Sequence, residues 1–311
     1  MQRFLPYNYD GSSCFMNSLL CALFFPNRLR IIDTYLLQGR RAESSETLKE
    51  LCGVLRTVAK CVRGSLVCDV PTYTAVRPVL SYLLYNLSGV QFSHGQHDPV
   101  DLFEALLRVC NVGGVFVTRK TVETLYHSGQ QSKVVTTDQM FCHSVLHSLN
   151  QGVKKFEALF PSIETLTPSE GTDLQRQRTI VEFGGGPVLV LTRETGAASK
   201  SVEYGRYSAS TKGYYLPMLN TVDRCVQWYE LQAVLCWKGL STGTAGHYVC
   251  FVYDDSRGEW YFYNDMNNVG TGFTALEVVP EGLETHAVYP PSYNGTMYIY
   301  SKVASPPSDV Q

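Results

Sequence analysis

The chain has 311 residues, of which 44% are hydrophobic and 17% are charged, so it can bury a sizeable core and is not expected to be disordered. Its formal net charge of −2 lacks the basic surplus of a nucleic-acid-binding protein. We expect no secretory leader, because no long apolar run follows Met1, and no run reaches the roughly 18 apolar residues needed to span a bilayer. We therefore expect no nucleic-acid or membrane partner, reduced thiols, and a cytoplasmic or nuclear location.

The first part of the chain, to about residue 110, is predicted to be mainly helical. Two serines precede Cys14 and can cap a helix that begins at or near it and ends at Pro26. Apolar residues at helical spacing predict a second helix over residues 46–60. A third helix is expected over residues 98–110, because a proline in its first turn suits a helix start.

The second part of the chain is predicted to consist mainly of strands, and helices followed by strands indicate an α+β fold. Short runs rich in β-branched and aromatic residues predict strands at 187–192, 229–237, 248–253 and 260–264. Residues 254–258 have the composition of a hairpin turn between the last two strands. Residues 111–180 mix strand-like and helical pieces with loops, and residues 301–311 are expected to form a loose tail.

Cys14 lies where a short loop containing Gly11 turns into a helix. The N-terminus of a helix carries partial positive charge, which favours a thiolate over a thiol. The small residues before Cys14 leave room for a substrate backbone. The segment is therefore a suitable position for a nucleophile, whereas a cysteine chosen at random is usually an inert core thiol.

His247 follows Gly246 at the start of a predicted strand, where it could act as the base that a nucleophilic thiol needs. The next strand ends at Asn264 and Asp265 after a turn, so it should pair antiparallel with the strand of His247. That pairing would place one of the two side chains beside the imidazole and fix its orientation. Taken singly, a structural histidine and a capped strand end are the alternatives.

In this order, the segments resemble the ubiquitin-specific proteases, a papain-like family. The resemblance spans nearly the whole chain and rests on two boxes, one around the cysteine and one around the histidine. The cysteine box is matched by Gly11, Cys14, Phe15, Met16, Asn17, Ser18 and Leu20. The histidine box is matched by Tyr229, Leu231, Gly246, His247, Tyr248, Trp260, Tyr261, Asn264 and Asp265.

The resemblance implies a papain-like fold that forms one catalytic domain. Residues 1–110 would be the helical thumb that carries the nucleophile, and residues 111–311 the fingers and the β-sheet palm. The implied activity is that of a thiol protease, which hydrolyses the isopeptide bond after the C-terminal glycine of ubiquitin or a ubiquitin-like modifier. Cys14 would be the nucleophile and His247 the base. Asn264 is the expected orienting residue, and Asp265 is the second choice.

The segment from Gln96 through Asp98 to Asp101 resembles a further box of this family. Its acidic residues face the basic tail of ubiquitin, so Asp98 and Asp101 would do so here. The alternative is an acidic helix start, which the helix dipole favours by itself. Gln96, Gly246 and Tyr248 are also expected to bind substrate.

The chain departs from the family pattern in the oxyanion region and in the fingers. Tyr9 stands where the family has an asparagine that donates to the oxyanion, and Asn8 is expected to substitute for it. No C-x-x-C pair occurs, only Cys142 lies in the corresponding zinc-binding stretch, and residues 111–180 look short. We therefore expect reduced fingers, no metal and no other cofactor.

Two alternatives remain open at this point. A viral papain-like protease that cuts polyproteins after Gly-Gly would suit the compact chain, the divergent cysteine box and the missing zinc pairs. A catalytically weak pseudoprotease that only binds ubiquitin would suit the tyrosine at position 9.

Overall fold

The computed structural model divides into two compact units. Unit 1 comprises Met1–Gly113, Thr195–Ser199 and Gln232–Tyr298, and unit 2 comprises Gly114–Glu194, Lys200–Leu231 and Ile299–Gln311. The structure describes residues 4–6, 12–38, 45–64, 75–93, 95–112, 114–127, 130–139, 163–166, 174–193, 201–220, 222–239, 246–266, 273–280 and 282–310. The segments that carry Cys14 and His247 thus belong to the same unit, while the thumb, fingers and palm assignment stays a prediction.

The helices of unit 1 pack around α1 (Cys14–Phe24), which is buried along its whole length. It contacts α3 (Glu46–Val62) and α6 (Pro99–Val109), and α5 (Val76–Ser88) contacts both of these. Full burial explains why α1 is apolar on every side rather than along one stripe. The predictions of α1, α3 and α6 are confirmed.

Two short elements follow α1, the 3₁₀-helix η1 (Arg28–Ile32) and α2 (Asp33–Leu36). Cys61, in the last turn of α3, is disulfide-bonded, so the expectation of reduced thiols is wrong at this residue.

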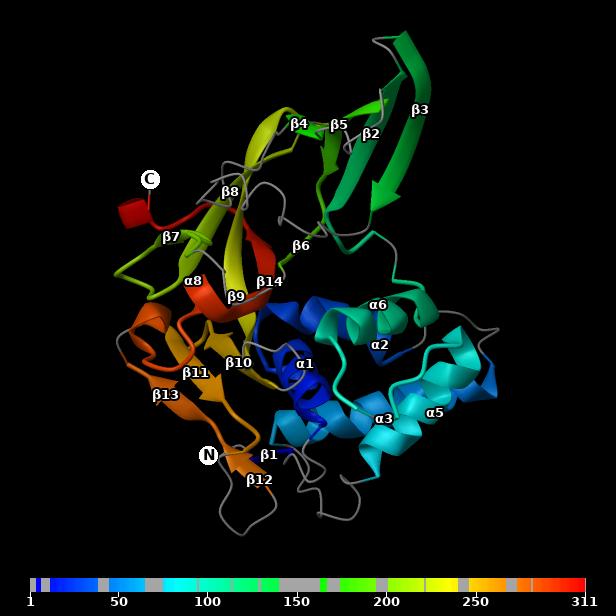
Figure 1. Ribbon diagram of the computed structural model, residues 1–311. Coiled ribbons are helices and arrows are strands. Elements are labelled where there is room, and N and C mark those ends of the chain that lie inside the picture. Colours follow the sequence, from blue (N-terminus) through cyan, green and yellow to red (C-terminus); the bar gives the residue numbers. More distant parts are fainter. Residues whose placement is uncertain are drawn as a thin grey trace. The chain divides into compact units, whose positions relative to one another are not determined.

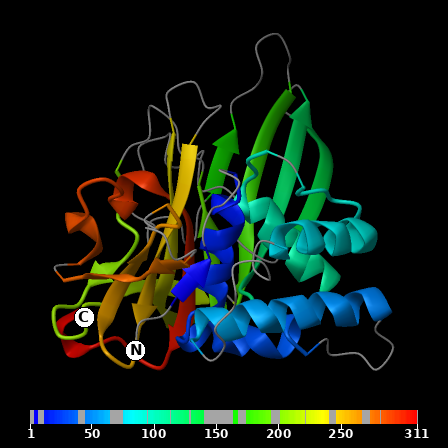
Figure 2. The same cartoon turned by 90° about the horizontal axis from the view of Figure 1, so that it is seen from below.

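The strands of unit 1 are organised around β10 (Gly246–Asp254). It pairs antiparallel with β11 (Glu259–Tyr263) on one side and with β9 (Cys225–Gly239) on the other. The hairpin predicted between the last two strands is confirmed, and β13 (Glu277–Val279) adds to the far side of β11. Figures 1 and 2 show α1 lying along β10, between the helices and the strands of the unit.

The remaining elements of unit 1 are short. β1 (Phe4–Pro6) pairs antiparallel with β12 (Phe273–Ala275). η3 (Leu283–Thr285) and α8 (Pro291–Asn294) precede β14 (Gly295–Val303), whose second half belongs to unit 2.

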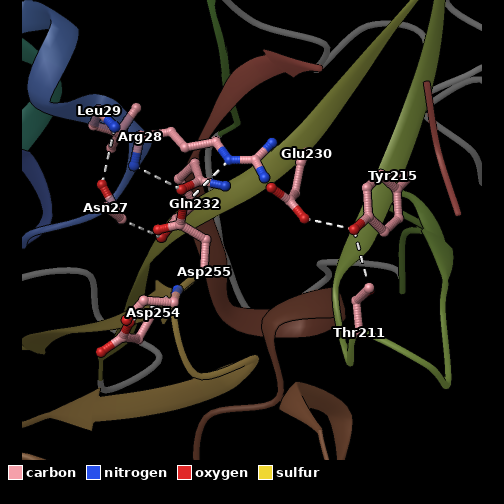
Figure 3. A network of polar contacts seen from close by, with 10 residues as sticks. Asn27, Arg28, Leu29, Thr211, Tyr215, Glu230, Gln232, Asp254 and Asp255 are labelled. Carbon is pink, nitrogen blue, oxygen red and sulfur yellow. Dashed lines mark hydrogen bonds and ion pairs between the residues drawn. The ribbon is translucent and has the colours of Figure 1, made fainter. Parts of the chain in front are cut away.

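A network of polar groups, some buried and some exposed, holds the segment after α1 against β9 (Figure 3). The Asn27 side chain donates to the Gln232 carbonyl at 3.2 Å and accepts from the Leu29 N–H at 3.0 Å. The Arg28 N–H donates to the Gln232 side chain at 3.3 Å, and the Arg28 guanidinium pairs with Asp255 in the turn after β10 at 3.3 Å. The C-terminal end of α1 is therefore fixed in place relative to β9 and β10.

Unit 2 contains a four-stranded antiparallel sheet in the order β3-β2-β5-β4 (Figure 1). Its strands are β2 (Thr118–His127), β3 (Gln130–Gln139), β4 (Ile163–Leu166) and β5 (Leu174–Gly184). The sheet takes up much of the segment that the sequence pattern left as a mixture of strand and helix.

The other strands of unit 2 are β6 (Val188–Thr192), β7 (Arg206–Tyr207) and β8 (Tyr214–Asn220), with the first half of β9 paired to β8. Tyr215 donates from its hydroxyl to buried Glu230 across this pair at 2.5 Å, as drawn in Figure 3.

The last residues of the chain are packed in unit 2, so the expected loose tail is wrong. Residues 301–303 continue β14, and a 3₁₀-helix, η4, covers Ser308–Val310. Val310 is buried against Tyr215 and Val303, and the Asp309 carboxylate accepts from the Ser208 hydroxyl at 2.9 Å. A buried apolar residue and a hydrogen-bonded carboxylate hold the segment despite its two prolines.

Candidate active site

Cys14 is the first residue of α1, and its side chain is almost completely buried. Its Sγ accepts from the Tyr248 N–H and from the Gln96 side chain, each at 3.5 Å. Ser13 occupies the N-cap position, but its side chain makes no capping hydrogen bond to the helix. The predicted helix start is therefore correct, whereas serine capping is not what holds it.

His247 lies one residue before the backbone N–H that reaches the Cys14 sulfur, and its Nε2 is 2.8 Å from Asn264 Oδ1. The antiparallel hairpin brings these two residues together, because Cys250 is opposite Tyr263 in the register. Asn264 therefore lies beside the imidazole, and its role as the orienting residue stays a prediction.

The Asn264 amide fixes which imidazole nitrogen carries the proton. Its Oδ1 also accepts from the Met266 N–H at 3.0 Å, so this atom is the amide oxygen. Because a carbonyl oxygen only accepts, His247 must carry its proton on Nε2. The other ring nitrogen, Nδ1, is then the basic one.

Asp265 lies slightly farther from the imidazole and is completely buried. Its Oδ1 is 3.5 Å from His247 Nε2, and its Oδ2 accepts from the Asn17 side chain at 2.8 Å. Asn17 stands one turn after Cys14 on α1, so this bond links the nucleophile helix to the hairpin. Sequence analysis assigned no role to Asn17, although an asparagine in a helix that is otherwise apolar is a usable signal.

Gln96 lies in the loop before α6, and its side chain points at the Cys14 sulfur. Its Nε2 donates both to the Cys14 sulfur and to the Gly246 carbonyl. Gly246 has no room for a side chain, because a Cβ would overlap the indole of Trp237. Gln96 thus contacts both the nucleophile and Gly246, and the predicted role of these two residues in binding substrate stays a prediction.

The acidic residues of the Gln96 segment belong to the start of α6. Asp98 is the N-cap and accepts from the Val100 N–H at 2.9 Å, and Asp101 lies exposed in the first turn. Burial raises the pKa of the Tyr248 hydroxyl, and the negative charges of Asp98, the Cys14 thiolate and Asp101 raise it further. Both carboxylates therefore lie close enough to Tyr248 to raise the pKa of its hydroxyl, and Asp98 also caps α6. Asn8, the predicted oxyanion donor, lies outside the described residues.

Burial sets the protonation state of the two reacting groups. It raises the pKa of the Cys14 thiol; the Tyr248 N–H lowers it, the Asp265 carboxylate raises it, and the Gln96 amide lowers it. Burial also lowers the pKa of His247, against the hydrogen bond to Asn264. Both shifts favour the neutral forms of the thiol and the imidazole, so burial opposes the effect of the helix terminus on which the sequence argument relied.

Among the described residues, no group of three or more His, Cys, Asp or Glu side chains is arranged to hold a metal ion. In the same part of the chain, no helix is both long and apolar enough to cross a membrane.

Comparison with solved structures supports the fold. The Ubp8–Sgf11–Sus1–Sgf73 SAGA DUB module bound to monoubiquitin has a TM-score of 0.60 at 16% identity, over 97% of this chain and 70% of that chain. The same module bound to ubiquitin aldehyde has a TM-score of 0.58 at 15% identity, over 97% and 70%. Such likeness, with the helices and antiparallel strands described above, gives this chain the papain-like α+β fold.

Comparison of sequences supplies the family. A search of curated proteins finds no match. The family model described as ubiquitin carboxyl-terminal hydrolase matches residues 8–271, which include the cysteine, the histidine and the residues that follow β11. Nothing in these matches supports the viral alternative. The chain belongs to the ubiquitin carboxyl-terminal hydrolase family.

Proposed function

We propose that this protein is a deubiquitinating cysteine protease in which Cys14 is the nucleophile, His247 the base and Asn264 the orienting residue. One observation carries the assignment of roles. A single hairpin holds the imidazole on Asn264 at 2.8 Å, while the next backbone N–H reaches the Cys14 sulfur at 3.5 Å. Nucleophile, base and orienting group are the three parts that such chemistry needs.

The reaction begins from the neutral pair. Cys14 Sγ attacks the carbonyl carbon of the C-terminal glycine of ubiquitin while His247 Nδ1 takes the thiol proton. The tetrahedral intermediate collapses, the C–N bond breaks, and the imidazolium gives its proton to the leaving lysine amine. Water then attacks the thioester, His247 takes a proton from it, and the sulfur leaves as the thiol with that proton.

Gln96 is suited to stabilise the oxyanion in this reaction. Its Nε2 carries donors at 3.5 Å from the attacking sulfur, and its bond to the Gly246 carbonyl holds the amide in place. Preorganised donors beside the developing charge are a large contribution to acyl-transfer catalysis. Gln96 thereby supplements or replaces Asn8, whose role stays a prediction.

The ubiquitin tail is the expected substrate segment. Both solved structures above contain the Ubp8 module with ubiquitin or ubiquitin aldehyde. Asp98 and Asp101 offer negative charge near Tyr248 to the basic tail. A cytoplasmic or nuclear location stays a prediction.

Labelling with a ubiquitin probe that carries a C-terminal electrophile tests the proposal. The wild type should gain the mass of ubiquitin, and Cys14→Ala should not. Cys21→Ala is the matched control, because Cys21 is another buried cysteine of α1 and should leave labelling intact. Labelling of Cys14→Ala at the wild-type rate contradicts the assignment. Binding of ubiquitin without labelling of the wild type identifies a pseudoprotease.

A further inference from the structure

Arg77, in the first turn of α5, is a buried arginine that points at the loops around the nucleophile rather than at solvent. Its Nη1 donates to the Ser12 hydroxyl at 2.6 Å, and its Nη2 donates to the Gly95 carbonyl at 2.8 Å. Its Nε donates to the Phe92 carbonyl at 3.4 Å. One guanidinium thus uses all three of its nitrogens on two separate loops.

The two loops that Arg77 joins are those that deliver the reacting groups. Ser12 stands two residues before Cys14, and Gly95 stands immediately before Gln96. Gly95 has a φ of +74°, in the region that favours glycine, where its carbonyl meets the guanidinium.

The guanidinium also touches the start of α1 itself. It lies 5.7 Å from the ring centroid of Phe15, the residue after Cys14, within the range of a cation–π contact. The same ring is 5.3 Å from that of His97, the residue after Gln96. Arg77 therefore connects the residues before Cys14 to those before Gln96, and the Phe15–His97 contact connects the residues that follow them.

We propose that Arg77 is a positioning residue for the reaction, which sets the distance between the Cys14 sulfur and the Gln96 amide. The proposal rests on the function given above, because Gln96 matters only where an oxyanion forms. The planar fork of an arginine can hold two acceptors in fixed directions at once, which a lysine cannot.

Arg77→Lys keeps the charge but loses the fork. A misplacement of about 1 Å between reacting groups costs about 100-fold in rate, so kcat should fall about 10- to 100-fold with a much smaller change in KM. Arg63→Lys is the matched control. Arg63 also donates to a backbone carbonyl, that of Phe24 at 3.0 Å, but at the other end of α1. It should keep kcat within about threefold, since no reacting group lies there.

A double-mutant cycle with Gln96→Ala separates positioning from a general structural role. In the wild type and in Arg63→Lys, Gln96→Ala should lower kcat for a ubiquitin substrate with a fluorogenic leaving group by about tenfold or more. In Arg77→Lys the same change should cost less than about threefold, because Gln96 is then already out of place. Additive losses, or equal kcat for Arg77→Lys and Arg63→Lys, overturn the proposal.

A second readout keeps the test independent of ubiquitin hydrolysis. The rate of Cys14 alkylation by iodoacetamide, followed by peptide mapping, reports the surroundings of the sulfur even if no ubiquitin substrate is cleaved. Gln96→Ala should change this rate in the wild type and not in Arg77→Lys, whereas equal changes overturn the proposal. If Arg77→Lys does not fold, Ser12→Ala removes the hydroxyl that accepts from Arg77 Nη1 at 2.6 Å. This variant then replaces Arg77→Lys in the kinetic cycle and in the alkylation experiment.

Discussion

Polar side chains lie at both ends of α1, but their hydrogen bonds serve different purposes at the two ends. At the C-terminal end, Asn27 and Gln232 bond to each other and to neighbouring backbone groups (Figure 3). At the N-terminal end, Cys14 Sγ receives two donors at 3.5 Å, and Asn17 reaches the buried Asp265. The first set satisfies backbone groups at the start of η1 and on β9, whereas the second leaves a reactive atom within reach of donors.

The comparison shows that polar groups at the C-terminal end of α1 stabilise the fold, whereas those at the N-terminal end serve the reaction at some cost in stability. Buried hydrogen bonds at the C-terminal end each contribute about 1 kcal/mol to stability. At the N-terminal end, burial of the Asp265 carboxylate costs stability, and proteins keep such groups where chemistry needs them. Changes at one end should therefore affect activity, and changes at the other should affect stability.

His247→Ala should have the largest effect. Loss of the base should lower kcat/KM by about 10³-fold without a large change in stability, measured on a fluorogenic ubiquitin substrate. His286→Ala is the matched control, because that ring packs against Phe251 and Phe262 in the same unit, at 5.2 and 4.3 Å. It should lower stability and keep activity within a few-fold. A His247→Ala protein with more than a tenth of wild-type activity would contradict the site.

Asn264→Ala should come next, with kcat/KM lower by about 10- to 100-fold, because the imidazole loses the acceptor at 2.8 Å. Asp265→Asn keeps an oxygen in place and should cost less, since its closest oxygen is 3.5 Å from the ring. The same kinetic assay ranks the two variants. A larger loss for Asp265→Asn would make Asp265 the orienting residue instead.

Gln232→Leu tests the C-terminal end. The Arg28 N–H loses this buried acceptor, so the free energy of unfolding should fall by about 1–3 kcal/mol. Urea denaturation measures the fall, and kcat of the folded protein should stay at the wild-type value. Lower kcat with unchanged stability would mean that the two ends of α1 are not separate in function.

The smallest expected effect is on the pH dependence of kcat/KM, whose limbs should shift along the pH axis without a large loss of maximal activity. Burial lowers the pKa of His247, so its basic form persists to lower pH and the acid limb of kcat/KM should lie below the usual value of about 6.5. Burial raises the pKa of Cys14, so the alkaline limb should lie above about 8.5. Asp265→Asn removes a negative charge that raises the pKa of Cys14, and should move the alkaline limb to lower pH. If the alkaline limb does not move in Asp265→Asn, the Asp265 charge does not control the pKa of Cys14.

The local elements that carry the candidate site could be predicted from the sequence, whereas its long-range contacts could not. The helix that starts at Cys14 and the hairpin that joins His247 to Asn264 follow from local periodicity and a turn, so they could be found in advance. The bond from Asn17 to Asp265 joins residues 248 positions apart, and no local pattern reports it. The role of Arg77 likewise depends on loops that only the fold brings together.

The four-stranded sheet of unit 2 escaped prediction for a different reason. Residues 130–139 are mostly polar, and they include two adjacent valines where a half-buried strand would alternate. The packed end of the chain was missed because its composition is typical of a loop, whereas the contacts of Val310 and Asp309 that help to hold it are long-range.

The close approach of Gly246 and Trp237 has a consequence for how this chain can change over generations. A methyl group at position 246 would overlap the indole, so an alanine there is excluded while the tryptophan remains. A smaller residue at position 237 would first have to open the space. Positions 237 and 246 lie on paired strands and are therefore expected to vary together among descendants of this sequence. Substitution of Trp237 by a smaller residue should come before substitution of Gly246 by a larger one.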